Sequence, residues 1–323
     1  MREMMRSDVA ALPIDLYRIA VGILSSFYFV RLLREYSDFT SYSGLLDHEL
    51  CQRVLWFTRL NLWQAGVPDG LVAASLFLGL GSTLALTLGW RPRPAALTAW
   101  VVAVTHFRWN MLVANLDDSG IQLILFWCIL LPTGHTLVGR KWNEDWRAIR
   151  LNGLTVRLFY ANLFLYYLVT GLTKYGSDLW RGGYALYIAL QLPISNTSGW
   201  WTPADLSYLA PLNYSTMVIE PLLPFLVLLP RNHPLKWLGG AVWFSLHTGI
   251  AALLGIAYAN VGQILALILI FQGEIGDRFA RAAQESSRKA GATPLELPPR
   301  SRPQVDFAEN SSSRVALAYL IVF

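Results

Sequence analysis

The chain has 323 residues, of which 54% are hydrophobic and only 15% are charged. Soluble domains carry about 25% charged residues, so this composition excludes an ordinary soluble domain and favours a protein embedded in a membrane. The formal net charge is +5, but the basic residues are not clustered with aromatic ones, which gives no support to a nucleic-acid partner. Of the two cysteines, Cys128 lies inside an apolar run, so no disulfide framework is predicted.

Eight apolar segments approach the length that a membrane span requires. A helix needs about 20 mostly apolar residues to cross about 30 Å of hydrocarbon. The predicted spans are Leu12–Leu33, Val67–Trp90, Pro94–Leu116, Ser119–Val138, Leu154–Tyr175, Leu212–Pro230, Leu235–Gly255 and Tyr258–Phe271. The sequence therefore predicts an all-α fold, a polytopic transmembrane helical bundle of about eight spans that is surrounded by membrane lipids.

The first span carries two charged residues, Asp15 and Arg18, inside its apolar run. No small-residue cleavage site follows it, so we expect the segment to be retained rather than removed as a signal peptide. Two long connecting segments, Arg31–Gly66 and Leu179–Pro211, are rich in Trp, Tyr and Leu. This composition predicts amphipathic segments that lie at the membrane interface.

The basic residues are divided unequally between the two sides of the predicted bundle. Fourteen lie on the N-terminal side, namely Arg2, Arg6, Arg91, Arg93, Arg140, Lys141, Arg147, Arg150, Arg231, Lys236, Arg278, Arg281, Arg288 and Lys289. Six lie on the opposite side, namely Arg31, Arg34, Arg53, Arg59, Lys174 and Arg181. The positive-inside rule then predicts a multi-pass protein of the cell membrane with both termini in the cytoplasm.

The sequence divides into two parts. Residues 1–273 form the predicted membrane domain, and residues 274–323 are rich in Gln, Ser, Arg, Pro and Glu. Such a segment buries too little apolar surface to offset its conformational entropy. We therefore expect a polar, disordered cytoplasmic tail.

Ionisable side chains inside spans are costly, so each of them indicates a candidate function. Lys174 shares its helical face with Thr170, Tyr167 and Tyr160 because these residues recur at helical spacing. One interpretation is structural: Lys174 pairs with Glu220 between two helices, or extends its amine to the interface. The other is chemical, because partial burial disfavours the ammonium and makes a neutral amine available as a general base.

The remaining polar residues in the spans also allow two interpretations. His247 acts either as a hydrogen-bonded tie between helices or as a catalyst, whereas His106 and Arg108 are expected to be structural ties. Asp117 and Asp118 precede a predicted helix, where carboxylates interact favourably with the helix dipole. The sequence lacks the GxxxxGK[ST], HExxH and CxxC motifs, so we predict no metal site.

Four stretches resemble one family in the same order along the chain. They read YYLVTGLTKYGSDLWRGGYAL (Tyr166–Leu186), ANLDDSGIQLILFWCILLPTG (Ala114–Gly134), STMVIEPLLPFLVLLP (Ser215–Pro230) and LHTGIAALLGIAYAN (Leu246–Asn260), after an opening at Tyr17–Gly22. This arrangement resembles the vitamin K-dependent gamma-carboxylase-like proteins, whose membrane part is called the HTTM (horizontally transferred transmembrane) domain. The resemblance implies a helical bundle with an outward or lumenal site.

The resemblance also implies a chemistry. In the animal enzymes, oxidation of a reduced vitamin K generates a strong base that removes a gamma proton from glutamate, and carbon dioxide adds to the carbanion. A lysine in the motif that matches Lys174 acts there as the base that deprotonates the hydroquinone. A reduced quinone is therefore the expected cofactor, and a peptide or small carboxylate the expected substrate.

The sequence departs from the family at two places. The animal enzymes carry a large lumenal region after the membrane domain, where this sequence has only the polar tail, so we do not expect a propeptide-tagged substrate. Asn115, Asp117 and Asp118 stand where the animal enzymes have a histidine. The predicted catalytic residues are Lys174 and His247, and the predicted substrate-binding residues are Tyr167, Thr170, Glu220, Asn115, Asp118 and Trp180.

Two functions follow from this reading. The first is a quinol-dependent oxidase or carboxylase-like enzyme with Lys174 as the base. The second is a non-enzymatic membrane protein, an immunity or export partner, that binds a lipid or peptide in the same cavity. A transporter is less favoured because neither paired broken helices nor an inverted repeat is present.

Overall fold

The structure is a computed structural model that describes residues 8–54, 62–63, 66–138, 141–142 and 149–289. Within these residues the protein is almost entirely helical, which confirms the predicted all-α class. The helices that overlap the eight predicted apolar segments are α2 (Ala11–Arg34), α4 (Asp69–Leu88), α5 (Pro92–Trp109), α6 (Leu116–Leu130), α7 (Leu154–Lys174), α10 (Leu206–Val227), α11 (Pro234–Leu253) and α12 (Ala257–Ile270).

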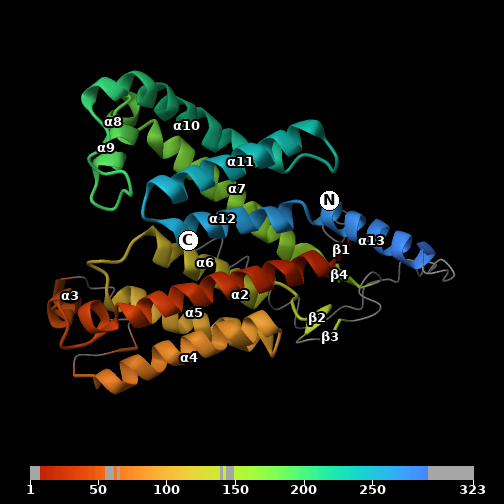
Figure 1. The fold of residues 1–323 in the computed structure, drawn as a ribbon, viewed down its shortest axis with the longest axis horizontal. Coiled ribbons are helices and arrows are strands. Elements are labelled where there is room, and N and C mark those ends of the chain that lie inside the picture. Colours follow the sequence, from red (N-terminus) through yellow and green to blue (C-terminus); the bar gives the residue numbers. More distant parts are fainter. Residues whose placement is uncertain (1–7, 55–61, 64–65, 139–140, 143–148, 290–323) are drawn as a thin grey trace.

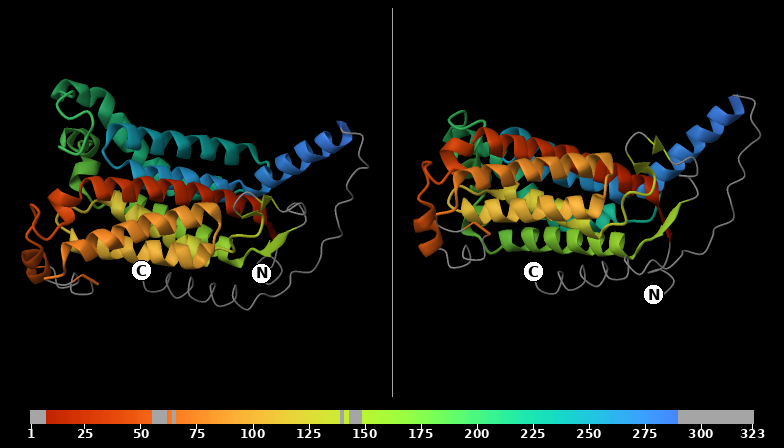
Figure 2. Two further views of the ribbon diagram at one scale, coloured as in Figure 1. Left: turned by 60° about the horizontal axis from the view of Figure 1, so that its bottom comes forward. Right: turned by 90° about the horizontal axis from the view of Figure 1, so that it is seen from below.

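The remaining described elements lie at the two ends of these helices. They are the π-helix η1 (Tyr36–Thr40), α3 (His48–Val54), α8 (Asp178–Arg181), α9 (Ala185–Gln191), the 3₁₀-helix η3 (Pro203–Asp205) and α13 (Gln272–Lys289). Strand β1 (Asp8–Ala10) pairs antiparallel with β4 (Arg150–Asn152), and β2 (Leu137–Val138) pairs antiparallel with β3 (Lys141–Trp142). Figure 2 shows the strands and α13 at one end of the bundle and α3, α8 and α9 at the other.

The helices pack as two groups (Figure 1). In the first group, α2 packs on α4 and α12, and α5 packs on α4 and α6. In the second group, α10 packs on both α7 and α11. The main helix-to-helix contact between the groups is that of α11 with α12. The space between the groups contains the candidate site.

Two helices of the described chain, α2 and α4, are long and apolar enough to cross a membrane. A third span is formed if α12 and the first part of α13, which are bent by 62° relative to each other, count as one. Helices α5 and α6 are shorter than their predicted segments, and α12 is as short as predicted. With 15 and 14 residues, α6 and α12 extend only about 21–22 Å at 1.5 Å per residue. Length and composition thus support a membrane location through two or three helices.

The boundaries of α6 differ from the predicted segment Ser119–Val138 for local reasons. The Asn115 side chain accepts a hydrogen bond from the backbone N–H of Asp117, and Asp118 accepts one from the backbone N–H of Asn115. This capping box starts α6 at Leu116. The helix ends at Leu130, two residues before Pro132, because proline disfavours helical geometry in the residue that precedes it.

Part of the predicted tail is a helix. Residues 272–289 form α13, where the composition predicts a disordered segment from residue 274 onward. Apolar residues such as Ile275 and Phe279 recur at helical spacing, and composition alone does not register that periodicity. Residues 290–323 lie outside the described residues, so the prediction for them is not tested.

The two charged residues of the first span form a buried ion pair. The Asp15 carboxylate accepts hydrogen bonds from four consecutive backbone N–H groups, those of residues 134–137, and from the Thr136 hydroxyl. The Arg18 guanidinium donates to the backbone carbonyl groups of Leu86, Thr87 and Leu137. The pair therefore joins α2 to the carboxyl end of α4 and to the segment that follows α6, and Arg18 donates to carbonyl groups of the last turn of α4.

Small residues bring helices close together beside the candidate site. A Cβ atom on Gly171 of α7 would lie 2.5 Å from Cδ of Pro221 on α10. A Cβ atom on Gly120 of α6 would lie 2.7 Å from Cα of Ala259 on α12. Such close approach of backbones is typical of helix pairs in membranes, where small residues favour van der Waals packing.

Candidate functional site

A cavity of about 1320 Å³ lies between α6, α7, α10, α11 and α12, with residues of the α8–α9 segment at one end. Its lining is mostly apolar, including leucine, isoleucine, valine and alanine side chains from all of these helices. A small number of polar side chains project into it from α7, α10, α11 and α12. A large apolar cavity with few polar groups is typical of a site for a hydrophobic small molecule.

An ion pair stands at the α8 end of the cavity. Lys174 at the end of α7 pairs through Nζ with a carboxylate oxygen of Glu220 on α10. The two side chains are 15% and 11% exposed. Lys174 Nζ also donates to the carbonyl of Thr170 at 3.3 Å and lies 5.0 Å from the centre of the Trp180 ring. The ammonium is thus held between a carboxylate and an aromatic face, both of which stabilise its charged form.

The close packing of α7 on α10 brings Lys174 to Glu220. Gly171 and Pro221 are the residues at which α7 and α10 come closest beside this pair, and each lies within one turn of one ion-pair residue. The carbonyl of Thr170 is one turn before Lys174 in the helix. The structure therefore bears out the predicted contact of Lys174 with Glu220 between two helices.

Three hydrogen-bonded residues, Tyr167, His247 and Asn260, line the cavity further from its α8 end. The Nδ1 atom of His247 lies 2.7 Å from Oδ1 of Asn260, whose amide nitrogen donates to the carbonyl of Ile256. Because this Asn260 oxygen is an acceptor, Nδ1 of the imidazole is the donor in this contact. The other ring nitrogen, Nε2, contacts the hydroxyl of Tyr167. A neutral imidazole then accepts at Nε2 the hydrogen bond that Tyr167 donates.

Neighbouring side chains hold Tyr167, His247 and Asn260 in place. Tyr167 packs on Trp243 with ring centres 4.2 Å apart, and its hydroxyl lies 3.3 Å from Oε1 of Gln263. The Trp243 indole donates to the backbone carbonyl of Gln263 at 2.8 Å. These contacts join α7, α11 and α12. His247 has both ring nitrogens occupied by protein partners, as a tie between helices requires, and it also lines the cavity.

Six of the eight predicted site residues line this cavity, namely Lys174, His247, Tyr167, Thr170, Glu220 and Trp180. Asn115 and Asp118 are not among its lining residues, because their side chains cap α6 and Asp118 also accepts a hydrogen bond from the Tyr28 hydroxyl at 2.6 Å. The resemblance placed them where the animal enzymes have a histidine, but in this chain the two residues mark the start of a helix. We therefore remove these two residues from the candidate site.

The neighbouring polar residues have structural partners as well. Asp117 accepts a hydrogen bond from the backbone N–H of Ala259 and lies 3.7 Å from a guanidinium nitrogen of Arg31. His106 contacts Thr40 and Asn110 through Nε2. Both residues therefore join elements at the end of the bundle that carries α3, which is the structural role predicted for His106.

Sequence reasoning missed the three amide side chains of the cavity: Asn162 on α7, and Asn260 and Gln263 on α12. The Asn162 side chain accepts a hydrogen bond from the Trp127 indole at 3.1 Å. Amide side chains inside an apolar segment are themselves a signal, because each needs a hydrogen-bond partner in the membrane. This signal is weaker than that of an ionisable residue, because a neutral amide costs less than a charge to place in hydrocarbon.

Comparison with known protein families, with curated proteins and with solved structures finds no match to this chain. Among the described residues no group of three or more His, Cys, Asp or Glu side chains is arranged to hold a metal ion. Its function is therefore inferred from the motifs and from the geometry of the cavity.

Proposed function

We propose that this protein is a multi-pass membrane protein of the HTTM type, related to the vitamin K-dependent gamma-carboxylases, that binds a reduced quinone in the cavity and uses Lys174 as a proton acceptor. In this proposal all eight predicted segments cross the membrane and both termini are cytoplasmic. The observation that carries it is the large apolar cavity with the Lys174–Glu220 ion pair at one end.

The arrangement of the two ends supports this orientation. Strands β1 and β4, together with α13, lie at the end that the excess of basic residues assigns to the cytoplasm, and α8 and α9 lie at the opposite end (Figure 2). Lys174 ends α7 beside α8. The ion pair is therefore on the outer side in this proposal, as the resemblance implies.

The cavity fits a lipid-soluble quinone by shape and chemistry. Its lining offers the rings of Tyr166 and Trp180 for stacking and leaves few polar groups, namely those of Lys174, Tyr167 and nearby amides, to orient oxygen atoms. Leu165 and Val169 of α7 line the cavity and are 45% and 55% exposed. A lipid-soluble molecule would therefore enter from the bilayer beside α7.

The ion pair supplies a route for a proton. When bound, a reduced quinone supplies two electrons and an acidic hydroxyl group. Lys174 is held as an ammonium by Glu220, so its amine becomes a base only after Nζ passes a proton to the Glu220 carboxylate. Two adjacent neutral groups cost less than two charges where water is scarce. Nζ of Lys174 would then accept the proton of the bound hydroxyl group, and Glu220 would keep the proton that it received from Lys174.

The test is quinol turnover by the purified full-length chain in lipid nanodiscs. We expect Lys174→Ala and Lys174→Arg to lower the turnover number at least about 100-fold, the lower range for loss of a general base. Lys236→Gln is the matched control, because Lys236 is also a buried, ion-paired lysine and does not line the cavity. Unchanged turnover in both Lys174 variants would exclude the mechanism.

The Lys174–Glu220 ion pair also favours a second function, because Glu220 compensates the charge of the Lys174 ammonium. With Lys174 paired to Glu220, the cavity is a nearly uncharged apolar container, which also suits a lipid or an apolar peptide that is bound without turnover. Mass spectrometry of the ligand that copurifies with the chain separates the two functions. A bound quinone supports the enzyme, whereas a phospholipid or peptide supports the binding protein.

A further inference from the structure

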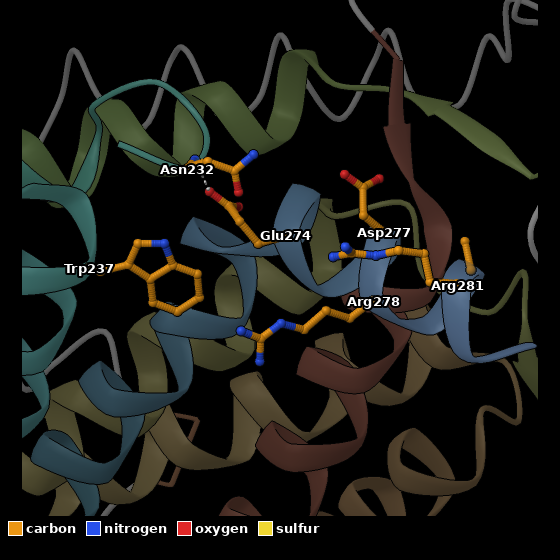
Figure 3. Close-up of a pocket in the computed structure, with 7 residues that line it drawn as sticks. Asn232, Trp237, Glu274, Asp277, Arg278 and Arg281 are labelled. Carbon is orange, nitrogen blue, oxygen red and sulfur yellow. Dashed lines mark hydrogen bonds between the residues drawn. The ribbon is translucent and has the colours of Figure 1, made fainter. Parts of the chain in front are cut away.

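A second cavity, of about 570 Å³, lies at the opposite end of the bundle from Lys174. It is formed by α13, the start of α11 and the turn that precedes α11, and it is lined by Asn232, Trp237, Glu274, Asp277, Arg278 and Arg281. Figure 3 shows the guanidinium groups of Arg278 and Arg281 extending from α13 on the side that faces Trp237. We propose that this cavity binds the headgroup of an anionic phospholipid of the phosphatidylglycerol class.

The charges around this cavity leave two cations without acidic partners. Asp277 pairs with Arg231, and Glu274 pairs with Lys236, whose Nζ lies 2.8 Å from Oε1 of Glu274. No carboxylate of the described chain lies within ion-pair distance of Arg278 or Arg281, which are both exposed. Among the described residues at this cavity, four cationic side chains thus stand beside two carboxylates, an excess of two positive charges.

The arginines are placed for a phosphate at a membrane surface. The Arg278 guanidinium carbon lies 5.5 Å from the centre of the Trp237 ring, and tryptophan is enriched where the bilayer meets water. Helix α13 turns 62° away from α12, so it leaves the direction of the bundle at this level. Guanidinium groups bind phosphate by paired N–H donors and are attracted to the anionic cytoplasmic leaflet.

A buried carboxylate oxygen of Glu274 indicates which headgroup the cavity would bind. Oε2 of Glu274 is buried and has no hydrogen-bond partner among the described residues, although Glu274 is only 5% exposed. A buried acceptor without a donor is costly. The glycerol hydroxyl groups of phosphatidylglycerol would donate to it while the phosphate engages Arg278 and Arg281. Phosphatidic acid has the phosphate without that glycerol, and phosphatidylcholine lacks both the net charge and the hydroxyl donors.

The inference rests on the membrane orientation given under the proposed function, and it is independent of the chemistry of Lys174. The test is native mass spectrometry of the full-length chain after incubation with an equimolar mixture of the three lipids. We expect phosphatidylglycerol to be retained in preference to both others. Each arginine near the surface contributes about fivefold to binding, so Arg278→Gln with Arg281→Gln should lower its retention about thirtyfold.

The matched control is Arg91→Gln with Arg93→Gln, which removes two positive charges from the same end of the bundle outside this cavity. An equal loss in both double variants would mean general charge attraction and would overturn the proposal. Equal retention of phosphatidylcholine, or displacement of the lipid by equimolar inorganic phosphate, would overturn it as well. Equal retention of phosphatidic acid would exclude the role of Glu274. A failure of quinol turnover leaves these measurements unaffected.

Discussion

The buried pair of Asp15 and Arg18 allows a quantitative prediction about stability. Asp15 accepts five hydrogen bonds from residues 134–137, and Arg18 at 3.2 Å is its charged partner. The side chains are 1% and 0% exposed. Asp15→Ala would leave the Arg18 guanidinium without its anionic partner, and four backbone N–H groups and the Thr136 hydroxyl without their acceptor. Removing one partner of a buried ion pair costs about 3–5 kcal/mol, so we expect at least this loss in the free energy of unfolding.

The assay uses the two cysteines as reporters of unfolding. Cys51 and Cys128 are buried thiols that form no disulfide within the described residues, so a dye that fluoresces on reaction with thiols reports the unfolding temperature of the purified chain. A loss of about 3 kcal/mol should lower that temperature by about 6–12 °C. A decrease of less than about 2 °C would refute the reasoning.

A matched control and a double variant separate charge from packing. Asp178 and Arg181 form an ion pair with the same spacing, but their side chains are 92% and 60% exposed. Asp178→Ala should therefore leave the unfolding temperature nearly unchanged, because water and salt screen exposed pairs. The double variant Asp15→Ala with Arg18→Met should be more stable than Asp15→Ala alone, because it buries no unpaired charge.

Three further predictions use the same unfolding assay or the copurified ligand. Gly171→Ala should lower stability by about 1–3 kcal/mol because its Cβ would meet Pro221, whereas Gly249→Ala, whose Cβ would meet nothing within 4 Å, should not. Gly249→Phe should reduce the copurified ligand without changing the unfolding temperature, because Gly249 lines the large cavity. Burial lowers the pKa of His48, so the unfolded chain binds the proton more readily. Stability should fall as the pH drops below about 6.5, and His48→Gln should remove that component.

Hydrophobic patterning was sufficient to predict the eight helices that overlap the apolar segments, and the costly charges inside two of them predicted the contact between Lys174 and Glu220. An apolar run forms a helix in a membrane because every backbone group must be satisfied inside the segment, and that requirement is local. The pair of Lys174 and Glu220 was predictable because each lies inside an apolar segment, where a charge needs a partner. The helix ends were harder to predict, because they depend on caps such as Asn115.

The missed features depend on contacts between distant segments. Asn260 holds the His247 ring, and Gln263 lies beside Tyr167, but nothing in the sequence alone indicates which helices meet there. The partners of Asp15 are backbone N–H groups of residues 134–137. Backbone donors have no side-chain signature, so sequence reasoning identified the costly charge and not the groups that compensate for it.

The division of the helices into two groups has a consequence for how a bulky molecule reaches the large cavity. The three residues 254–256 connect α11 to α12 and thereby link the two groups. A tilt of α7, α10 and α11 as one block about this short link would widen the cavity towards the lipid phase. The closely packed glycine contact between α7 and α10 would travel with that block unchanged. Such a tilt would break hydrogen bonds to α12, among them that of His247 with Asn260 and that of Trp243 with the Gln263 carbonyl, whereas the ion pair of Lys174 and Glu220 would stay assembled throughout.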